Sequence, residues 1–272
     1  MFNRAIVGLD GSKPSFVASY YGLELGSKLN IPVVGIHVLD STLTEESLLA
    51  DLAGVLGFSY YEGISAKVKE FLEKESETLL DEFSTLGRKL NAKVSTLQTW
   101  GNPAKEISSQ ADKEDIVFVG RPSHEKAIKG IHISSTSEQV IRRADCPVFV
   151  AFKEEYKPIE SIMICHDGKE EDDKLVDFTK NLNKLYNAKL YLYHADELGS
   201  KKERLENLVK DSNIELIVEK NIAEDGIIKT SERLNTDLVI LGSHKKKLVH
   251  FFMGSTTTFV FHYIKTNLLV VK

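Results

Sequence analysis

The chain has 272 residues, of which 42% are hydrophobic and 28% charged, and its net charge is −5 at pH 7. This length suits two domains that each bury a core of their own. Residues 1–152 include 16 basic and 20 acidic side chains and the remainder 19 and 20, so the net charges are −4 and −1. Neither part has the positive excess needed to bind a nucleic-acid backbone, and we exclude DNA and RNA as partners.

The amino terminus and the two cysteines bear on the cell compartment. A strand pattern begins directly after residues 1–4, which leaves no room for a signal peptide, and no apolar run reaches 18 residues. Cys146 and Cys165 match neither zinc nor CxxC spacings and are expected to be reduced thiols in the core. The sequence therefore predicts a cytoplasmic protein without a membrane span.

Short apolar runs rich in valine and isoleucine alternate with amphipathic stretches along the chain. The expected strands cover 4–10, 32–38, 93–99, 115–120 and 147–152, then 160–166, 188–194, 214–219, 237–242 and 267–272. The expected helices cover 14–29, 65–90, 103–112 and 136–144, then 169–186, 200–211, 223–235 and 256–265. Strands that are apolar on both faces and joined by helices of this length predict parallel sheets covered on each side.

The second half of the chain repeats the landmarks of the first. Ala-Ile-Val-Gly-Leu-Asp-Gly at 5–11 returns as Ile-Met-Ile-Cys-His-Asp-Gly at 162–168, and His37 returns as His194 at the same offset. The preserved order indicates a duplication. It predicts one domain at 1–152 and another at 158–272, separated by the charged segment that precedes Pro158.

The repeat also marks a candidate site in each half. Asp10 and Asp167 end the first strands, and Gly120 and Gly242 end the fourth strands. Open parallel sheets bind ligands at the carboxyl ends of their strands, where the strand order reverses. The aspartates could hold a ribose or only cap the turn into the next helix.

The histidines that end the second strands, His37 and His194, are expected to have structural roles because those strands are buried. A catalytic histidine would also need a nucleophile or an orienting carboxylate within reach. The HExxH, GxSxG, GxxxxGK[ST] and GxGxxG motifs do not occur in the sequence. The sequence therefore offers no positive support for catalysis.

Six short segments of the first half form a recognisable series. They are Val-Gly-Leu-Asp-Gly-Ser at 7–12, Ile-His-Val at 36–38, Trp-Gly-Asn-Pro at 100–103, Gly-Arg-Pro-Ser at 120–123, Ser-Ser-Thr-Ser-Glu-Gln-Val at 134–140 and Asp-Cys-Pro-Val-Phe-Val at 145–150. In this order and spacing they resemble the universal stress protein family, here in tandem form. This resemblance implies an α/β fold with two tandem Rossmann-like five-stranded parallel sheets, helices on both faces, and adjacent first and fourth strands. The halves are then expected to pack as an intramolecular pseudo-dimer through their last strands, and a homodimer is a further alternative.

The resemblance also implies binding of ATP, with its accompanying Mg²⁺, through a loop of the form Gly-x2-Gly-x9-Gly-Ser/Thr before the last helix. Glycines let the backbone approach phosphates, and a helix N-terminus attracts them. The candidate residues in the second half are Asp167, Gly168, Ala195, Gly242, Ser243, His244, Lys245, Gly254, Ser255 and Thr256. Those in the first half are Asp10, Gly11, Ser12, Val38, Gly120, Arg121, Ser123, Ser134, Ser135 and Thr136.

Both loops depart from the family pattern. Ser123 and Ser134 replace two glycines in the first half, and Lys245 replaces one in the second half, while Gly254 is kept. The lysines at 245–247 could offset a lost backbone contact or form a solvated loop. We expect triphosphate to bind beside Gly254, where a side chain would block its approach and disfavour any positive φ. The first half is expected to bind triphosphate poorly or not at all.

An apolar segment near 41–64 has no counterpart in the second half. It contains Phe58, Tyr60 and Tyr61, which are expected near the mouth of the first-half site. So many apolar residues must cover the site of their own domain, the other half or another chain.

Our leading hypothesis is a non-enzymatic stress-response protein whose ligand-dependent conformation is recognised by partners. One alternative is a pair of degenerate nucleotide sites that bind an apolar small molecule beneath the insertion. Another is a slow ATP hydrolase, which would need a metal-bound phosphate and a positioned water.

Overall fold

The computed structural model describes residues 2–41, 64–121, 135–196, 200–243 and 253–272. The first half contains β1 (Ala5–Leu9), α1 (Lys13–Leu29), β2 (Pro32–Asp40), α3 (Ile64–Lys89), β3 (Lys93–Gly101), α4 (Pro103–Ser109), β4 (Ile116–Gly120), α5 (Thr136–Arg143) and β5 (Val148–Ala151). The second half contains β6 (Ser161–Cys165), the short 3-10 helix η3 (Glu170–Asp172), α6 (Asp173–Asn183), β7 (Lys189–Ala195), α7 (Lys202–Val209), β8 (Ile214–Glu219), α8 (Ala223–Leu234), β9 (Leu238–Gly242), α9 (Ser255–Tyr263) and β10 (Asn267–Val271).

Local signals in the sequence explain where these elements begin and end. Ser12 caps α1 by accepting a hydrogen bond from the Ser15 N–H, and the helix ends at Asn30 in the left-handed conformation. The helix expected at 169–186 is shorter, because the Asn183 side chain bonds both the N–H and the carbonyl of Ala188. These two bonds turn the chain out of the helix toward β7.

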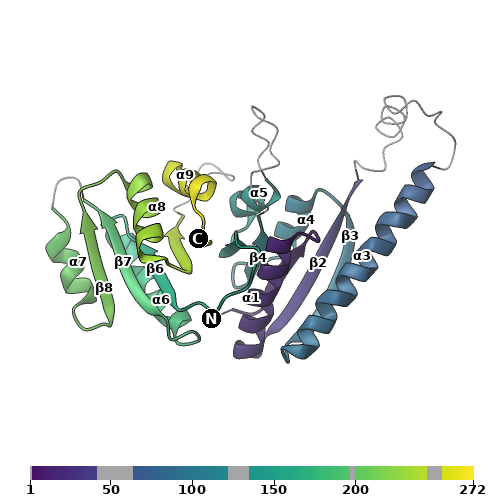
Figure 1. Ribbon diagram of the computed structural model, residues 1–272, viewed down its shortest axis with the longest axis horizontal. Helices are drawn as coiled ribbons and strands as arrows, with labels where there is room; N and C mark the ends of the chain where they lie inside the picture. Colours follow the sequence, from purple (N-terminus) through teal and green to yellow (C-terminus); the bar gives the residue numbers. More distant parts are fainter. Residues whose placement is uncertain (1, 42–63, 122–134, 197–199, 244–252) are drawn as a thin grey trace.

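The predicted parallel strands are confirmed, and they form one continuous sheet rather than two. The strand order is β3-β2-β1-β4-β5-β10-β9-β6-β7-β8, so the first and fourth strands of each half are neighbours. The last strands join the halves: β5 and β10 pair antiparallel, with Phe149 opposite Leu269. Figure 1 shows the halves on either side of this junction. The domain boundaries at 152 and 158 stay a prediction.

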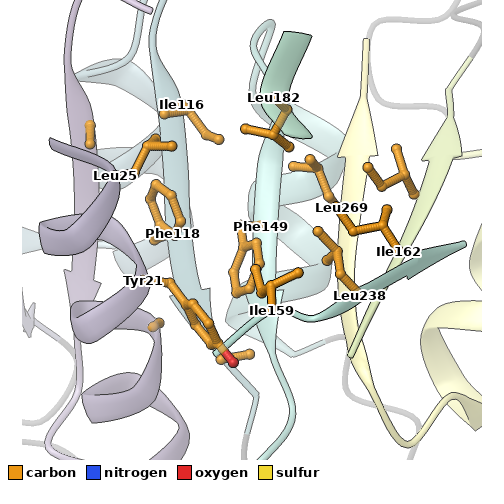
Figure 2. Close-up of a cluster of buried hydrophobic side chains, with 14 of the residues drawn as sticks. Tyr21, Leu25, Ile116, Phe118, Phe149, Ile159, Ile162, Leu182, Leu238 and Leu269 are labelled. Carbon is orange, nitrogen blue, oxygen red and sulfur yellow. The ribbon is translucent and has the colours of Figure 1, made fainter. Parts of the chain in front are cut away.

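The core consists of two apolar layers, one on each face of the sheet. Successive residues of a strand alternate between them: Val7 lies in the layer under α1, α3, α6 and α7, whereas Ile6 lies under α4, α5, α8 and α9. Each layer runs across the junction, as Figure 2 shows for Phe149, Leu269 and their neighbours. The halves therefore share their hydrophobic core.

Polar groups reinforce this junction. The Asn267 side chain accepts a hydrogen bond from the Phe152 N–H and donates to the Tyr21 hydroxyl at 3.1 Å. The Tyr21 hydroxyl in turn donates to the Lys157 carbonyl at 2.8 Å. Asn267 is 2% exposed, so these bonds satisfy polar groups that water does not reach.

Two further expectations concern burial. Cys146 and Cys165 are both buried and unbridged, as predicted. Burial raises the pKa of the Cys146 thiol to about 12, which makes it a poor nucleophile at neutral pH. In the described parts of the chain, no helix combines the length and the apolar character needed to cross a membrane.

Candidate functional site

Both halves have a hollow at the carboxyl ends of their first and fourth strands. The second-half cavity has a volume of about 310 Å³, whereas the hollow in the same place of the first half has about 150 Å³. A further first-half hollow of about 250 Å³ is lined by Asp10, Gly11 and His37. The predicted residues that line the second-half cavity are Asp167, Ala195, Gly242, Ser243, Gly254 and Thr256. Those that line the first-half cavity are Asp10, Val38, Gly120 and Thr136. The duplicated sheet has thus produced two sites of different size.

The aspartates that end β1 and β6 form equivalent turns. Asp10 Oδ1 accepts the Ser12 N–H at 2.9 Å, and Asp167 Oδ1 accepts the Lys169 N–H at 2.8 Å. The glycine after each aspartate has a positive φ, +74° at Gly11 and +82° at Gly168, which is a conformation that favours glycine. The predicted turn role of both aspartates is therefore present.

Lys169 distinguishes the second turn from the first. Its ammonium lies 2.7 Å from Asp167 Oδ2, whereas Ser12 at the corresponding position caps α1. Burial alone would raise the pKa of Asp167, but the hydrogen bonds and charge of Lys169 hold that pKa below its usual value. The Asp167 carboxylate is thus ionised at neutral pH and already attracts a cation.

One residue that lines the first-half cavity, Gly120, is also packed closely by α1. A Cβ at Gly120 would lie 2.2 Å from the Ser15 backbone nitrogen, so the first turn of α1 packs directly on the end of β4. At the N-terminus of α5, Ser135 accepts the Glu138 N–H, as the sequence predicts for a cap. This helix terminus therefore already has a side-chain acceptor.

The corresponding helix of the second half begins differently. Gly254 occupies the N-cap position of α9 and offers no side chain to the first N–H groups of the helix. Its φ is −57°, so the expected need for a positive φ is wrong, and a Cβ there would meet no atom within 4 Å. Gly254 and Thr256 line the cavity, while Ser255 is exposed. Thr256 Oγ1 donates to Glu224 Oε1 at 2.7 Å. Among the described residues no side chain caps the N-terminus of α9, and this open terminus borders the cavity.

Two histidines that face this cavity form a chain with backbone groups. His166 Nδ1 accepts the Gly168 N–H at 2.9 Å, so Nε2 bears the proton and donates to Asp173 Oδ1 at 3.0 Å. Burial lowers the pKa of His166, which agrees with a neutral ring. His194 donates from Nδ1 to the His166 carbonyl at 2.8 Å, while its buried Nε2 has no partner among the described residues.

His166 and Asp172 were not among the predicted site residues, although both line the cavity. The duplication contains the signal that identifies them, because residues 9 and 15 of the first half are leucine and serine.

Arg121 lies at the junction of the halves and does not line the first-half cavity. Its guanidinium donates to the Phe261 carbonyl of α9 and packs against the rings of Phe152 and Phe261. Nη2 has no partner among the described residues, and burial lowers the pKa of Arg121 to about 10. Arg121 thus links β4 to the other half.

We expect Arg121→Met to change stability by no more than about 1 kcal/mol, because replacing a buried charge by a packed apolar chain often costs little. Thermal unfolding should therefore shift by roughly 2–4 °C or less. Calorimetry should also find the ATP affinity unchanged. A fall above about 8 °C, or weakened ATP binding, would contradict this role.

The structure does not describe four of the predicted site residues: Ser123, Ser134, His244 and Lys245. Lysines 246 and 247 and the aromatic residues of the 41–64 insertion also lie outside the described residues.

Comparison with known proteins agrees with this geometry. The model of the universal stress protein family matches residues 1–151 and 195–272. The chain belongs to the universal stress protein family. Universal stress protein MJ0531 of Methanocaldococcus jannaschii is 25% identical over 155 residues, which cover 56% of this chain and 84% of the relative. The segment between the matched ranges contains β6, α6 and most of β7.

Solved structures show the same fold over the whole chain. A universal stress protein from Archaeoglobus fulgidus DSM 4304 superposes with a TM-score of 0.76 at 18% identity, covering 99% of this chain and 98% of that one. Protein PA1789 from Pseudomonas aeruginosa PAO1 superposes with a TM-score of 0.64 at 15% identity, covering 100% and 92%. At these identities the likeness establishes the fold alone.

Proposed function

We propose that this universal stress protein binds an adenine nucleotide in the cavity of its second half, and that partners recognise the liganded conformation. The observation that carries the proposal is the open N-terminus of α9 beside the cavity. Unpaired N–H groups and the helix dipole attract phosphate at such a terminus. The first-half counterpart is smaller and has a side-chain cap on α5.

The position of the other groups supports a nucleotide over a smaller anion. Asp167 follows β6, which ends at Cys165, and Ala195 ends β7. These are the places where the family resemblance expects ribose and adenine. Gly242 ends β9, the strand that pairs with β6 on one side and with β10 on the other. A volume of about 310 Å³ lies within the range of small-molecule sites, which starts near 300 Å³.

The lining also favours a polar ligand over an apolar one. Ile227, Leu241 and Tyr193 are interspersed with His194 and Ser243, whose Nε2 and hydroxyl are buried without a described partner. An apolar ligand would leave both groups unsatisfied, at a cost of about 1–3 kcal/mol each. A nucleotide can supply hydroxyl, amine and ring-nitrogen partners.

Titration calorimetry of the full chain with ATP and Mg²⁺ tests the proposal. We expect one ATP per chain, weaker binding of inorganic tripolyphosphate, and displacement of ATP by ADP. Equal binding of tripolyphosphate would show that the base and ribose are not recognised. Two sites per chain, or no binding, would contradict a site confined to the second half.

A further inference from the structure

The carboxyl end of β6 gathers three groups that can act as metal ligands. One ligand atom each from His166, Asp167 and Asp172 lies within 4.8 Å of the others. Ligand atoms around a tetrahedral zinc ion, at 2.0–2.2 Å from the metal, lie about 3.4 Å apart. A contraction of at most about 1.4 Å, from 4.8 to 3.4 Å, therefore brings the three groups to coordination distance.

The first half provides an internal control for this cluster. Leu9, Asp10 and Ser15 stand where the second half has His166, Asp167 and Asp172. Ser15 Oγ accepts the Asp10 N–H at 3.2 Å, and Asp172 Oδ2 accepts the Asp167 N–H at 2.9 Å in the same way.

A neutral hydroxyl thus suffices to hold this turn. The buried carboxylate of Asp172, which is 5% exposed, is not needed for the turn and adds charge in a place where burial is costly. The second half thus has one more carboxylate at this turn than the first half, and with His166 it completes a group of possible metal ligands.

The ring of His166 is oriented as in many metal sites. Its Nε2–H donates to Asp173, which leaves the lone pair on Nδ1, the nitrogen nearer the Asp167-Gly168 turn. Asp173 is itself held by Arg204 Nη2, at 2.7 Å from each carboxylate oxygen. A carboxylate that fixes the distal nitrogen of a histidine is the usual outer partner of a metal ligand.

His194 supplies independent evidence from a different strand. It is 4% exposed and lines the same cavity, and its Nε2 has no partner among the described residues. Because Nδ1 donates to the His166 carbonyl, the unused lone pair is on Nε2. A buried imidazole nitrogen with a free lone pair that lines the cavity can accept a proton donor or a metal ion.

We propose that the second-half cavity binds a divalent transition-metal ion through His166, Asp167 and Asp172, with His194 lining the same cavity. One imidazole and two carboxylates suit Zn²⁺, Co²⁺ or Mn²⁺, and the carboxylates neutralise the charge of the ion. The ion displaces the exposed ammonium of Lys169 from Asp167 and the Gly168 N–H from His166. This site does not depend on the proposed nucleotide binding.

The test uses the metal alone, with the full chain stripped of metal by a chelator and no nucleotide present. Titration with Co²⁺, followed by its visible absorption, should show one equivalent with the intense bands of a four- or five-coordinate ion, and Zn²⁺ should displace it. Asp172→Ser and His166→Leu copy the first half and should weaken binding by at least about tenfold. Asp177→Ser removes an exposed carboxylate from α6, the helix that follows Asp172, and should bind as the wild type does.

Asp172→Ser decides the outcome if His166→Leu does not fold, since the first half folds with serine at this place. Weak, multiple Co²⁺ sites of octahedral type in the wild-type chain would overturn the proposal. So would stoichiometric binding that Asp172→Ser leaves unchanged. Because no nucleotide is added, either result is independent of the ATP titration.

Discussion

Gly254→Val is expected to lower the affinity for ATP by at least about 100-fold, or about 2.7 kcal/mol, without disturbing the fold. Gly254 has φ −57° and ψ 156°, a backbone conformation that valine adopts readily, and a Cβ there meets no atom within 4 Å. The valine side chain would instead occupy the space beside the first N–H groups of α9, where we propose that the phosphates bind. Calorimetry should therefore record lost binding at an unchanged melting temperature.

The matched control is Ser135→Ala at the N-terminus of α5 in the first half. Loss of this cap should cost about 0.5–2 kcal/mol of stability, yet it should leave ATP binding intact. Gly254→Ala adds only one carbon and should weaken ATP less than valine does. Equal affinity in wild type and Gly254→Val would remove the phosphate site from this helix terminus.

Phe149→Ala is expected to destabilise the whole chain by about 3–5 kcal/mol. Phe149 is 3% exposed, and its ring lies 4.9 Å from that of Tyr21 and 5.2 Å from that of Phe118. It also stands opposite Leu269 at the antiparallel junction, so the resulting cavity opens between the halves. Urea unfolding should record the loss through circular dichroism and through the fluorescence of Trp100, the single tryptophan.

Because the core layers cross the junction, the two signals should shift together. Trp100 lies in the first half, whereas circular dichroism reports helices of both. Phe71→Ala serves as the control, since its ring is 61% exposed and its loss should cost within about 0.5 kcal/mol. A loss below about 1 kcal/mol for Phe149→Ala would show that this junction contributes little to stability.

The sequence alone determined the number, type and order of the described strands and the two aspartate turns. These features depend on local rules, namely side-chain periodicity, caps and the need for glycine at positive φ in Gly11 and Gly168. The duplication added the correspondence between β1 and β6 and between β4 and β9. The resemblance to the universal stress proteins then predicted the adjacency of first and fourth strands, which the sheet confirms.

Only the tertiary structure decided how these elements meet. The antiparallel pairing of β5 with β10 merges the sheets, and Arg121 turns toward Phe261, 140 residues further along the chain. The bonds from Asp173 to His166 and Arg204 span 7 and 31 residues. Beside the cavities, α1 packs on Gly120 in the first half, and Gly254 stands at the N-cap of α9 in the second half. Such contacts depend on the relative placement of whole elements, which local sequence patterns do not encode.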